Sequence, residues 1–182
     1  MTQALYFIID TLAQLVLLLF LLRFWLPLLR ADFRNPIAQG ILRFTSPLVL
    51  PVRRVVPPIG RIDTATVLVT FVIQYVVLLA LLVIAGTRAG AGALTVMSLL
   101  RLCTLSLNLF FFAILIRIIL SWVAPHAYNP ISAMAGSLAD PVLRPFRRII
   151  PPIGGLDVSP IFAIVILKAV EIFLQSLRPI PF

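Results

Sequence analysis

Four long runs of apolar residues constrain this sequence more than any other feature. They cover residues 4–29, 64–85, 102–124 and 158–177. The hydrocarbon core of a bilayer is about 30 Å thick, so an α-helix needs roughly 20 apolar residues to cross it, and each run meets that length. Because the runs are continuously apolar and not alternating, spanning β-strands are excluded. The sequence therefore predicts an all-α membrane protein with four transmembrane helices.

The composition excludes a soluble domain and most kinds of catalytic site. Hydrophobic residues make up 62% of the chain and charged residues 12%, against about 45–50% and about 25% in soluble globular proteins. The single histidine, His126, and the single cysteine, Cys103, cannot supply a disulfide or a metal-ligand set within one chain. Nucleotide-binding and hydrolase motifs are also missing from the sequence. We expect no metal, no cofactor and no enzymatic activity, and we interpret His126 as an ordinary residue at the membrane interface.

The chain matches itself, without a gap, at an offset of 94 residues. The matched positions are Arg23 with Arg117, Asn35-Pro36 with Asn129-Pro130, Pro47 with Pro141, Pro51 with Pro145, Arg53-Arg54 with Arg147-Arg148, Pro57-Pro58-Ile59-Gly60 with Pro151-Pro152-Ile153-Gly154, and Asp63 with Asp157. The chain is therefore a tandem duplication, with one repeat at residues 1–85, a flexible glycine-containing linker at 86–101 and a second repeat at 102–182. Each repeat holds two spans, so the copies point the same way as two parallel hairpins, unlike inverted transporter repeats.

The second copy carries a family resemblance. It reads Arg117-Ile-Ile-Leu-Ser-Trp, then Asn129-Pro130, then Asp140-Pro-Val-Leu-Arg-Pro-Phe-Arg-Arg-Ile-Ile-Pro-Pro-Ile-Gly-Gly-Leu-Asp157. This pattern resembles the repeat of the YggT family, and the resemblance covers most of both halves. It implies a polytopic inner-membrane protein, in a family linked to osmotic tolerance, to cell division or plastid organisation, and to b-type cytochrome assembly. The first copy has Thr45-Ser46 in place of Ala139-Asp140, so we expect the second copy to carry any activity of the motif.

The connector between the two spans of each repeat shows a helix signal followed by prolines. Asn129-Pro130 suits the N-cap and first position of a helix, and apolar residues follow at helical spacing. We expect a short amphipathic helix of about ten residues in each connector, lying along the membrane interface. It should end at Pro141, and at Pro47 in the first copy. Prolines beyond that point predict extended backbone that holds the following arginines at the level of the lipid headgroups.

Basic residues are concentrated in the two connectors. Nine lie there and three lie toward the other side: Arg30, Arg34, Arg43, Arg53, Arg54, Arg61, Arg144, Arg147 and Arg148, against Arg88, Arg101 and Arg178. The positive-inside rule then places the connectors in the cytoplasm and both termini outside, because the first run lacks the flanks of a cleaved signal peptide.

Two interpretations of the connector arginines stay open. They either set topology alone, or they bind anionic lipid headgroups or an acidic protein partner. The candidates for binding are Arg53, Arg54, Arg144, Arg147 and Arg148. The net charge of +9 does not indicate nucleic-acid binding, because the charges lie beside membrane spans.

Charged and amide side chains also occur inside the apolar runs. A charge at mid-bilayer costs about 2.5–3.5 kcal/mol, so each needs a partner or a route to the interface. Arg23 and Arg117 lie near enough to the connectors for partial snorkelling. Lys168 and Glu171 share a helix face and are expected to pair, unless Glu171 meets Arg117. Gln74, the counterpart of Lys168, should face the bundle interior. Asp63 and Asp157 are most simply helix N-caps, not catalytic residues.

Two kinds of function fit these features. The first is a non-enzymatic membrane organisation or assembly factor, whose basic connectors recruit lipid or a partner protein that the sequence does not name. The alternative is a small channel or osmotic-stress ion pathway lined by Arg117, Lys168 and Glu171. Four helices enclose no pore of useful size, so that alternative requires a homo-oligomer.

Overall fold

A computed structural model describes residues 2–123, 129–151 and 157–179, and within these ranges the chain is helical without β-strands. The helices are α1 Thr2–Leu28, α2 Pro36–Arg53, α3 Thr64–Ala85, α4 Ala91–Val123, α5 Pro130–Ile149 and α6 Ser159–Ser176. Four of them, α1, α3, α4 and α6, are long and apolar enough to cross a membrane. The predicted all-α fold with four spans is confirmed.

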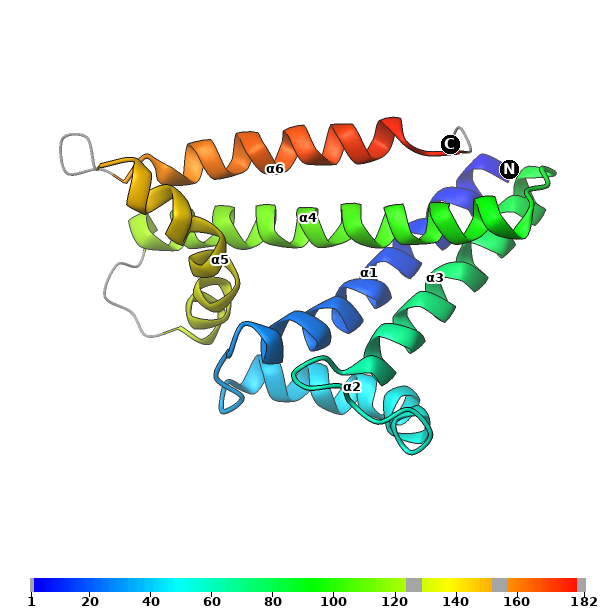
Figure 1. The fold of residues 1–182 in the computed structure, drawn as a ribbon, viewed down its shortest axis with the longest axis horizontal. Helices are drawn as coiled ribbons and strands as arrows, with labels where there is room; N and C mark the ends of the chain where they lie inside the picture. The colour runs from blue at the N-terminus through cyan, green and yellow to red at the C-terminus, as the bar shows by residue number, and fades with distance from the viewer. Residues whose placement is uncertain (1, 124–128, 152–156, 180–182) are drawn as a thin grey trace.

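The two repeats form two helical hairpins that point the same way (Figure 1). Helix α1 packs against α3, and α4 packs against α6. Both termini lie at one end of the bundle, and the connector helices α2 and α5 lie at the opposite ends of their hairpins. The hairpins join through a core cluster in which Leu21 and Leu26 of α1 pack with Leu109, Phe110 and Ala113 of α4. This arrangement confirms the parallel tandem hairpins.

The third span begins earlier than its hydropathy indicated. Helix α3 ends at Ala85, and the C-cap residue Gly86 has a φ of 66°, which allows its N–H to cap the carbonyls of Leu82 and Val83. The turn is then short, because α4 starts at Ala91 and not at 102. Leu94 and Met97 are buried against Leu78 and Leu82, and this packing extends the helix through most of the expected linker, Gly92 included. At 1.5 Å per residue, α4 is about 50 Å long and exceeds the hydrocarbon core.

The connector helices are also longer than expected. Asn35 and Asn129 cap them as predicted, each accepting a 2.9 Å bond from the second residue beyond. Both helices then continue through two prolines, Pro47 and Pro51 in α2 and Pro141 and Pro145 in α5, so the predicted extended backbone is wrong. In α2 these prolines lie on the exposed side, away from the buried stripe. Each proline removes one helical hydrogen bond, and packing of the opposite, buried face outweighs that cost.

The two connector helices begin next to each other. Asn35 Nδ2 donates a 2.7 Å hydrogen bond to the carbonyl oxygen of Pro130, which joins the cap of α2 to the first residue of α5. The buried stripes, Ala38, Ile41, Thr45 and Val49 in α2 and Ala135, Leu138, Ala139 and Leu143 in α5, follow helical spacing. The connectors thus form one packed layer, and not two separate loops.

Candidate functional site: braced connectors and a polar cavity

The same ion pair closes both connectors. Arg53, the last residue of α2, pairs with Asp63, and Arg147 near the end of α5 donates from Nε to Asp157 Oδ2 at 2.8 Å. In each copy the partners are ten residues apart. We call these two pairs the braces. Each brace ties the end of a connector helix to the chain segment that starts the next span.

Both aspartates also serve the helix start that follows them. Asp63 is the N-cap of α3 and accepts hydrogen bonds from the backbone and hydroxyl of Thr66, at 3.4 and 2.7 Å. Asp157 lies one residue before the N-cap Val158 and accepts the N–H of Ser159 at 3.0 Å. The predicted capping role is confirmed at Asp63 and shifted by one residue at Asp157.

These contacts set the protonation of the brace. Burial disfavours the charged form of both aspartates, but the bonds from Thr66 and Arg53, and from Ser159 and Arg147, outweigh it and lower both pKa values. Burial likewise opposes the charge of Arg147, while its bonds to Asp157 and Asp140 raise its pKa. The braces are therefore charged at neutral pH.

The repeated intramembrane arginines reach the connectors, but with different partners. Arg23 is only 3% exposed, and its Nη1 donates to Thr45 Oγ1 at 2.8 Å, Ser46 Oγ at 3.0 Å and the Leu42 carbonyl at 3.2 Å. Its Nε donates to Thr66 at 3.2 Å.

Arg117 instead donates from Nη1 to Asp140 Oδ2 at 2.7 Å, and no interaction with Glu171 accompanies it. The predicted snorkelling toward the connector fits both arginines, and the Arg117–Glu171 alternative is wrong.

Asp140 extends the brace of the second copy into a chain of four charges. Its Oδ1 accepts from Arg147 Nη1 at 3.0 Å while its Oδ2 accepts from Arg117. The order is Arg117, Asp140, Arg147, Asp157. Ser46 stands at the matching position of the first copy. The chain of that copy is therefore shorter, with Arg23 and Arg53 both meeting Asp63, and the Arg23 contact is a long one of 3.9 Å.

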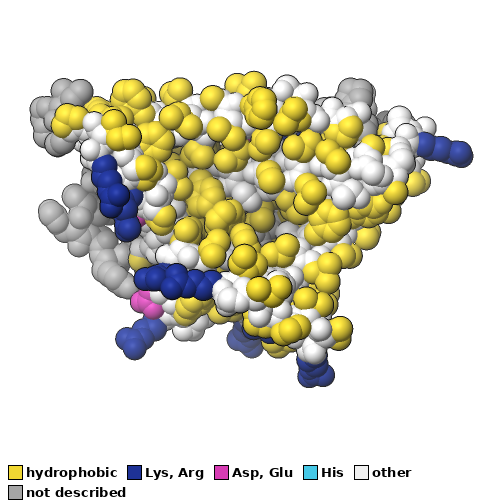
Figure 2. All heavy atoms as spheres, viewed as in Figure 1, with side chains coloured by type: hydrophobic (Ala, Val, Ile, Leu, Met, Phe, Trp, Pro, Cys, Tyr) yellow, Lys and Arg dark blue, Asp and Glu magenta, His cyan; other side chains and the backbone are white. Residues whose placement is uncertain are grey.

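Three of the five predicted binding arginines are free of ion pairs. Arg54, Arg144 and Arg148 are exposed, and none of their side chains makes an ion pair or hydrogen bond within residues 2–123, 129–151 and 157–179. Arg53 and Arg147 are held in the braces. Figure 2 shows basic side chains along the edges formed by the connector helices, with a broad apolar face between them. Binding by these arginines stays a prediction.

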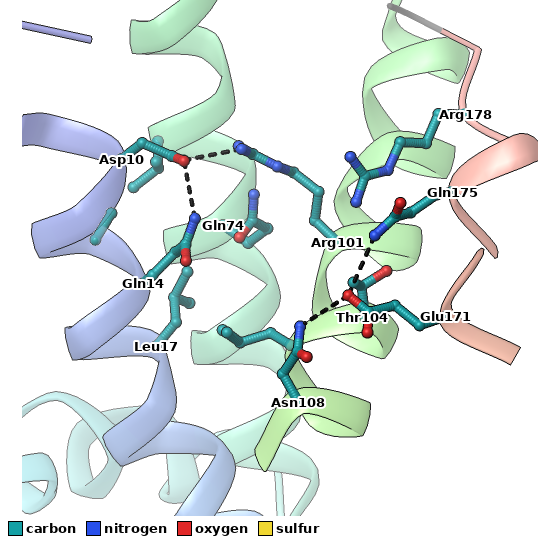
Figure 3. A pocket seen from close by; sticks show the side chains of 13 residues that line it. Asp10, Gln14, Leu17, Gln74, Arg101, Thr104, Asn108, Glu171, Gln175 and Arg178 are labelled. Atoms are coloured by element: carbon teal, nitrogen blue, oxygen red, sulfur yellow. Dashed lines mark hydrogen bonds and ion pairs between the residues drawn. The ribbon is translucent and has the colours of Figure 1, made fainter. Parts of the chain in front are cut away.

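A polar cavity of about 300 Å³ lies between α1, α3, α4 and α6. On one side, Lys168 Nζ pairs with Glu171 Oε2 at 2.7 Å, which confirms the predicted pair. Asn108 bridges the two, accepting from Lys168 at 2.9 Å and donating to Glu171 at 3.1 Å. Gln175 donates to the same Glu171 oxygen at 3.1 Å (Figure 3).

On the other side of the cavity, Asp10 Oδ1 pairs with Arg101 at 2.9 Å and Oδ2 accepts from Gln14 at 2.8 Å. Gln74 is 3% exposed, as its predicted inward orientation requires, and projects between these groups (Figure 3). Sequence reasoning missed the role of Arg101 because that residue was assigned to a linker. The missed signal is the run of good helix formers before residue 102.

The described residues contain no group of three or more His, Cys, Asp or Glu side chains that could hold a metal ion. His126 lies outside them. Cys103 is a free, exposed thiol.

Four spanning helices and two amphipathic connector helices, repeated in tandem, define a multi-pass helical membrane protein. The family model CCB3/YggT matches residues 2–84 and 96–178, and the chain belongs to this family. An uncharacterized protein of Pseudomonas aeruginosa is 44% identical over 172 residues, covering 93% of this chain and 87% of the relative. A protein of Vibrio alginolyticus is 41% identical, covering 84% of this chain and 83% of the relative. The uncharacterized protein YggT of Escherichia coli K12 is 33% identical, covering 91% and 86%. No solved structure matches the chain.

Proposed function

We propose that this chain is a non-enzymatic organisation or assembly factor of the bacterial inner membrane, which binds anionic lipid headgroups, or an acidic membrane partner, through its connectors. The duplicated brace carries the proposal. The brace holds Arg53 in the first copy and Arg147 in the second. The residue that follows each of them, Arg54 or Arg148, is exposed next to a backbone that the brace holds in place. Groups held in place before binding lose less conformational entropy when a ligand arrives.

The chemistry of the connector layer supports a membrane-surface ligand. Guanidinium groups match phosphate oxygens in a bidentate geometry, and basic clusters next to spans attract anionic lipids. Exposed apolar side chains lie on the same helices: Phe44, Leu48 and Leu50 on α2, and Ile131 and Ile149 on α5. An amphipathic helix with both features is suited to the interface between headgroups and acyl chains. In this proposal α2 and α5 are interfacial helices.

The proposed orientation follows from charge. The connectors hold most of the arginines, so the positive-inside rule places them in the cytoplasm and the termini outside. Anionic lipids and acidic partners are then available to Arg54, Arg144 and Arg148. Osmotic tolerance, cell division and cytochrome assembly are the contexts in which such recruitment would act.

The proposal is tested by the lipid dependence of stability. The protein is placed in phosphatidylcholine nanodiscs with and without phosphatidylglycerol, and its thermal midpoint is measured. Phosphatidylglycerol should raise the midpoint of the wild type, because a ligand of the folded state stabilises it. Arg54→Gln with Arg148→Gln should lose most of that increase, while Arg88→Gln, at the other end of the bundle, should keep it. An equal increase in all three proteins would contradict the proposal.

The polar cavity favours a second candidate, the oligomeric channel. Lys168 and Glu171 line or border that cavity, but Arg117 belongs to the connector chain and lies outside it. Neutralising Lys168 and Glu171 together should then change ion flux in liposomes. If the purified protein conducts ions, and the Arg54/Arg148 double variant complements a deletion strain normally, the channel replaces our first proposal.

A further inference from the structure

The polar cavity lies far from the connectors, at the end of the bundle that holds the termini. Arg178 lies two residues after Ser176, the last residue of α6, and lines the cavity. Gln74 lines the inner part, and at 1.5 Å per residue it lies about 15 Å along α3 from Thr64. The cavity therefore extends from the bundle end to about the middle of the spans. Between the cavity and the connectors lies the packed hydrophobic cluster that contains Leu21 and Phe110.

The acidic groups of the cavity already have partners. Asp10 accepts one bond on each carboxylate oxygen, from Arg101 and Gln14. Glu171 accepts three bonds, from Lys168, Asn108 and Gln175. Neither carboxylate is available as the main binding group for a cation.

The groups that lack partners are donors. Gln74 Nε2 and Arg178 Nε are buried atoms with no hydrogen-bond partner within the described chain, and both residues line the cavity. Gln74 is almost completely buried, with an exposed fraction of 3%, and its side chain points into the space between α1 and α4 (Figure 3). The lining holds two cations, Arg101 and Arg178, and two carboxylates, Asp10 and Glu171. Lys168 does not line the cavity, but its ion pair with Glu171 gives the whole group of charges one net positive charge. Gln74 Nε2 and Arg178 Nε therefore lack an acceptor, and the net positive charge around them favours an acceptor that is negatively charged.

We propose that this cavity binds a small oxyanion, a carboxylate or phosphate group, with Gln74 and Arg178 among its donors. The volume of about 300 Å³ is within the range of small-ligand sites. The group can be a free solute or the headgroup of an anionic lipid in the leaflet at the terminal end of the bundle. This site is separate from the connector surface, and it needs neither conduction nor recruitment to exist.

The test uses the full-length protein in phosphatidylcholine nanodiscs, titrated by calorimetry with sodium acetate and with inorganic phosphate, and compared at constant sodium and ionic strength. A second arm replaces part of the lipid with phosphatidylglycerol and follows the thermal midpoint. Saturable binding of acetate or phosphate supports a free oxyanion. A phosphatidylglycerol effect that Arg178→Gln reduces supports a lipid headgroup.

The variants distinguish the cavity from other cationic surfaces. Arg178→Gln and Gln74→Leu should each weaken binding about tenfold, which is the loss of one good contact. Gln74→Glu should abolish binding because it places a carboxylate within the cavity, and it reports on the site even if Gln74→Leu folds poorly. Arg88→Gln, an exposed arginine near the same end, should bind acetate and phosphate normally, as should Arg54→Gln with Arg148→Gln. In the phosphatidylglycerol arm the control is Arg88→Gln alone, because the connector variant is expected to lose most of that response for a separate reason. No saturable effect in either arm, or effects unchanged in Arg178→Gln and Gln74→Glu, would mean that the cavity holds only water and would overturn the proposal.

Discussion

The two copies of the repeat place an arginine at the same point of the same span and satisfy it in different ways. In the first copy Arg23 has a side-chain exposure of 3% and binds the hydroxyls of Thr45, Ser46 and Thr66. In the second copy Arg117 has a side-chain exposure of 34% and binds the carboxylate of Asp140. Arg23 also lies 3.9 Å from the carboxylate of Asp63, at the limit of an ion pair. Both arginines reach the connector, but Arg23 is buried and bound mainly by hydroxyls, whereas Arg117 is partly exposed and bound by a carboxylate. We infer that the first copy contributes mainly stability and that the second is the adaptable copy.

The largest difference is expected when each arginine is removed. Arg23→Met breaks a buried hydrogen-bonded charge and should lower the free energy of unfolding by about 3 kcal/mol. Arg117→Met breaks a half-exposed pair and should cost about 1 kcal/mol or less. Unfolding in mixed micelles with increasing dodecyl sulfate measures both. Equal losses would remove the distinction between the copies.

A smaller effect is expected at mid-span, where the second copy holds a charged pair and the first an uncharged glutamine. Glu171→Gln should destabilise the protein by about 1–2 kcal/mol, because Lys168 then loses its ionised partner. Lys168→Gln with Glu171→Gln should cost less than the sum of the single changes. The same micelle titration supplies the four free energies, and strict additivity would show that the pair does not couple.

A pair of glycines tests the Arg117 contact directly. A Cβ on Gly136 would lie 2.7 Å from Arg117 Nη1, whereas nothing lies within 4 Å of one on Gly40. Gly40→Ala should stabilise its exposed helix by roughly 0.5–1 kcal/mol. Gly136→Ala should lose that gain, because Arg117 must move away from Asp140. In an Arg117→Met background the penalty should disappear; its persistence would assign it to another contact.

The smallest effect concerns acid. The folded pKa values of Asp63 and Asp157 are lowered, so their contribution to stability is present above the unfolded pKa of about 4 and is lost as the pH falls below it. The thermal midpoint of the wild type should fall as the pH drops below about 4. Asp63→Asn should reduce this fall more than Asp157→Asn, because Asp63 has a side-chain exposure of 12% and Asp157 one of 40%. The reverse order would show that side-chain exposure does not determine how much each aspartate contributes to stability.

Local signals predicted the parts of this protein that depend on neighbours in sequence. Continuous hydropathy predicted the spans, the Asn-Pro pairs predicted both helix starts, and the three-residue spacing predicted the Lys168–Glu171 pair. The pairing of Asp10 with Arg101 joins residues 91 apart, so it depends on how the two hairpins pack.

The prediction that the connector helices end at their first internal proline was wrong for a related reason. Pro141 and Pro145 disfavour a helix locally, but burial of Leu138, Ala139 and Leu143 stabilises it. The contact between Arg147 and Asp140, seven residues apart, depends on that continued helix. A rule based on proline alone therefore missed both the helix and the charge chain that it positions.

In our proposal the two parallel copies present their braced, basic connectors on the cytoplasmic side. Cysteine accessibility tests it in intact cells, in a Cys103→Ser background that carries Arg54→Cys, Arg148→Cys or Arg88→Cys one at a time. A membrane-impermeant maleimide should label the position 88 variant in intact cells, and the position 54 and 148 variants only after permeabilisation. Labelling at 54 and 148 from outside would reverse the orientation, and labelling at only one of the two would contradict the parallel arrangement of the copies.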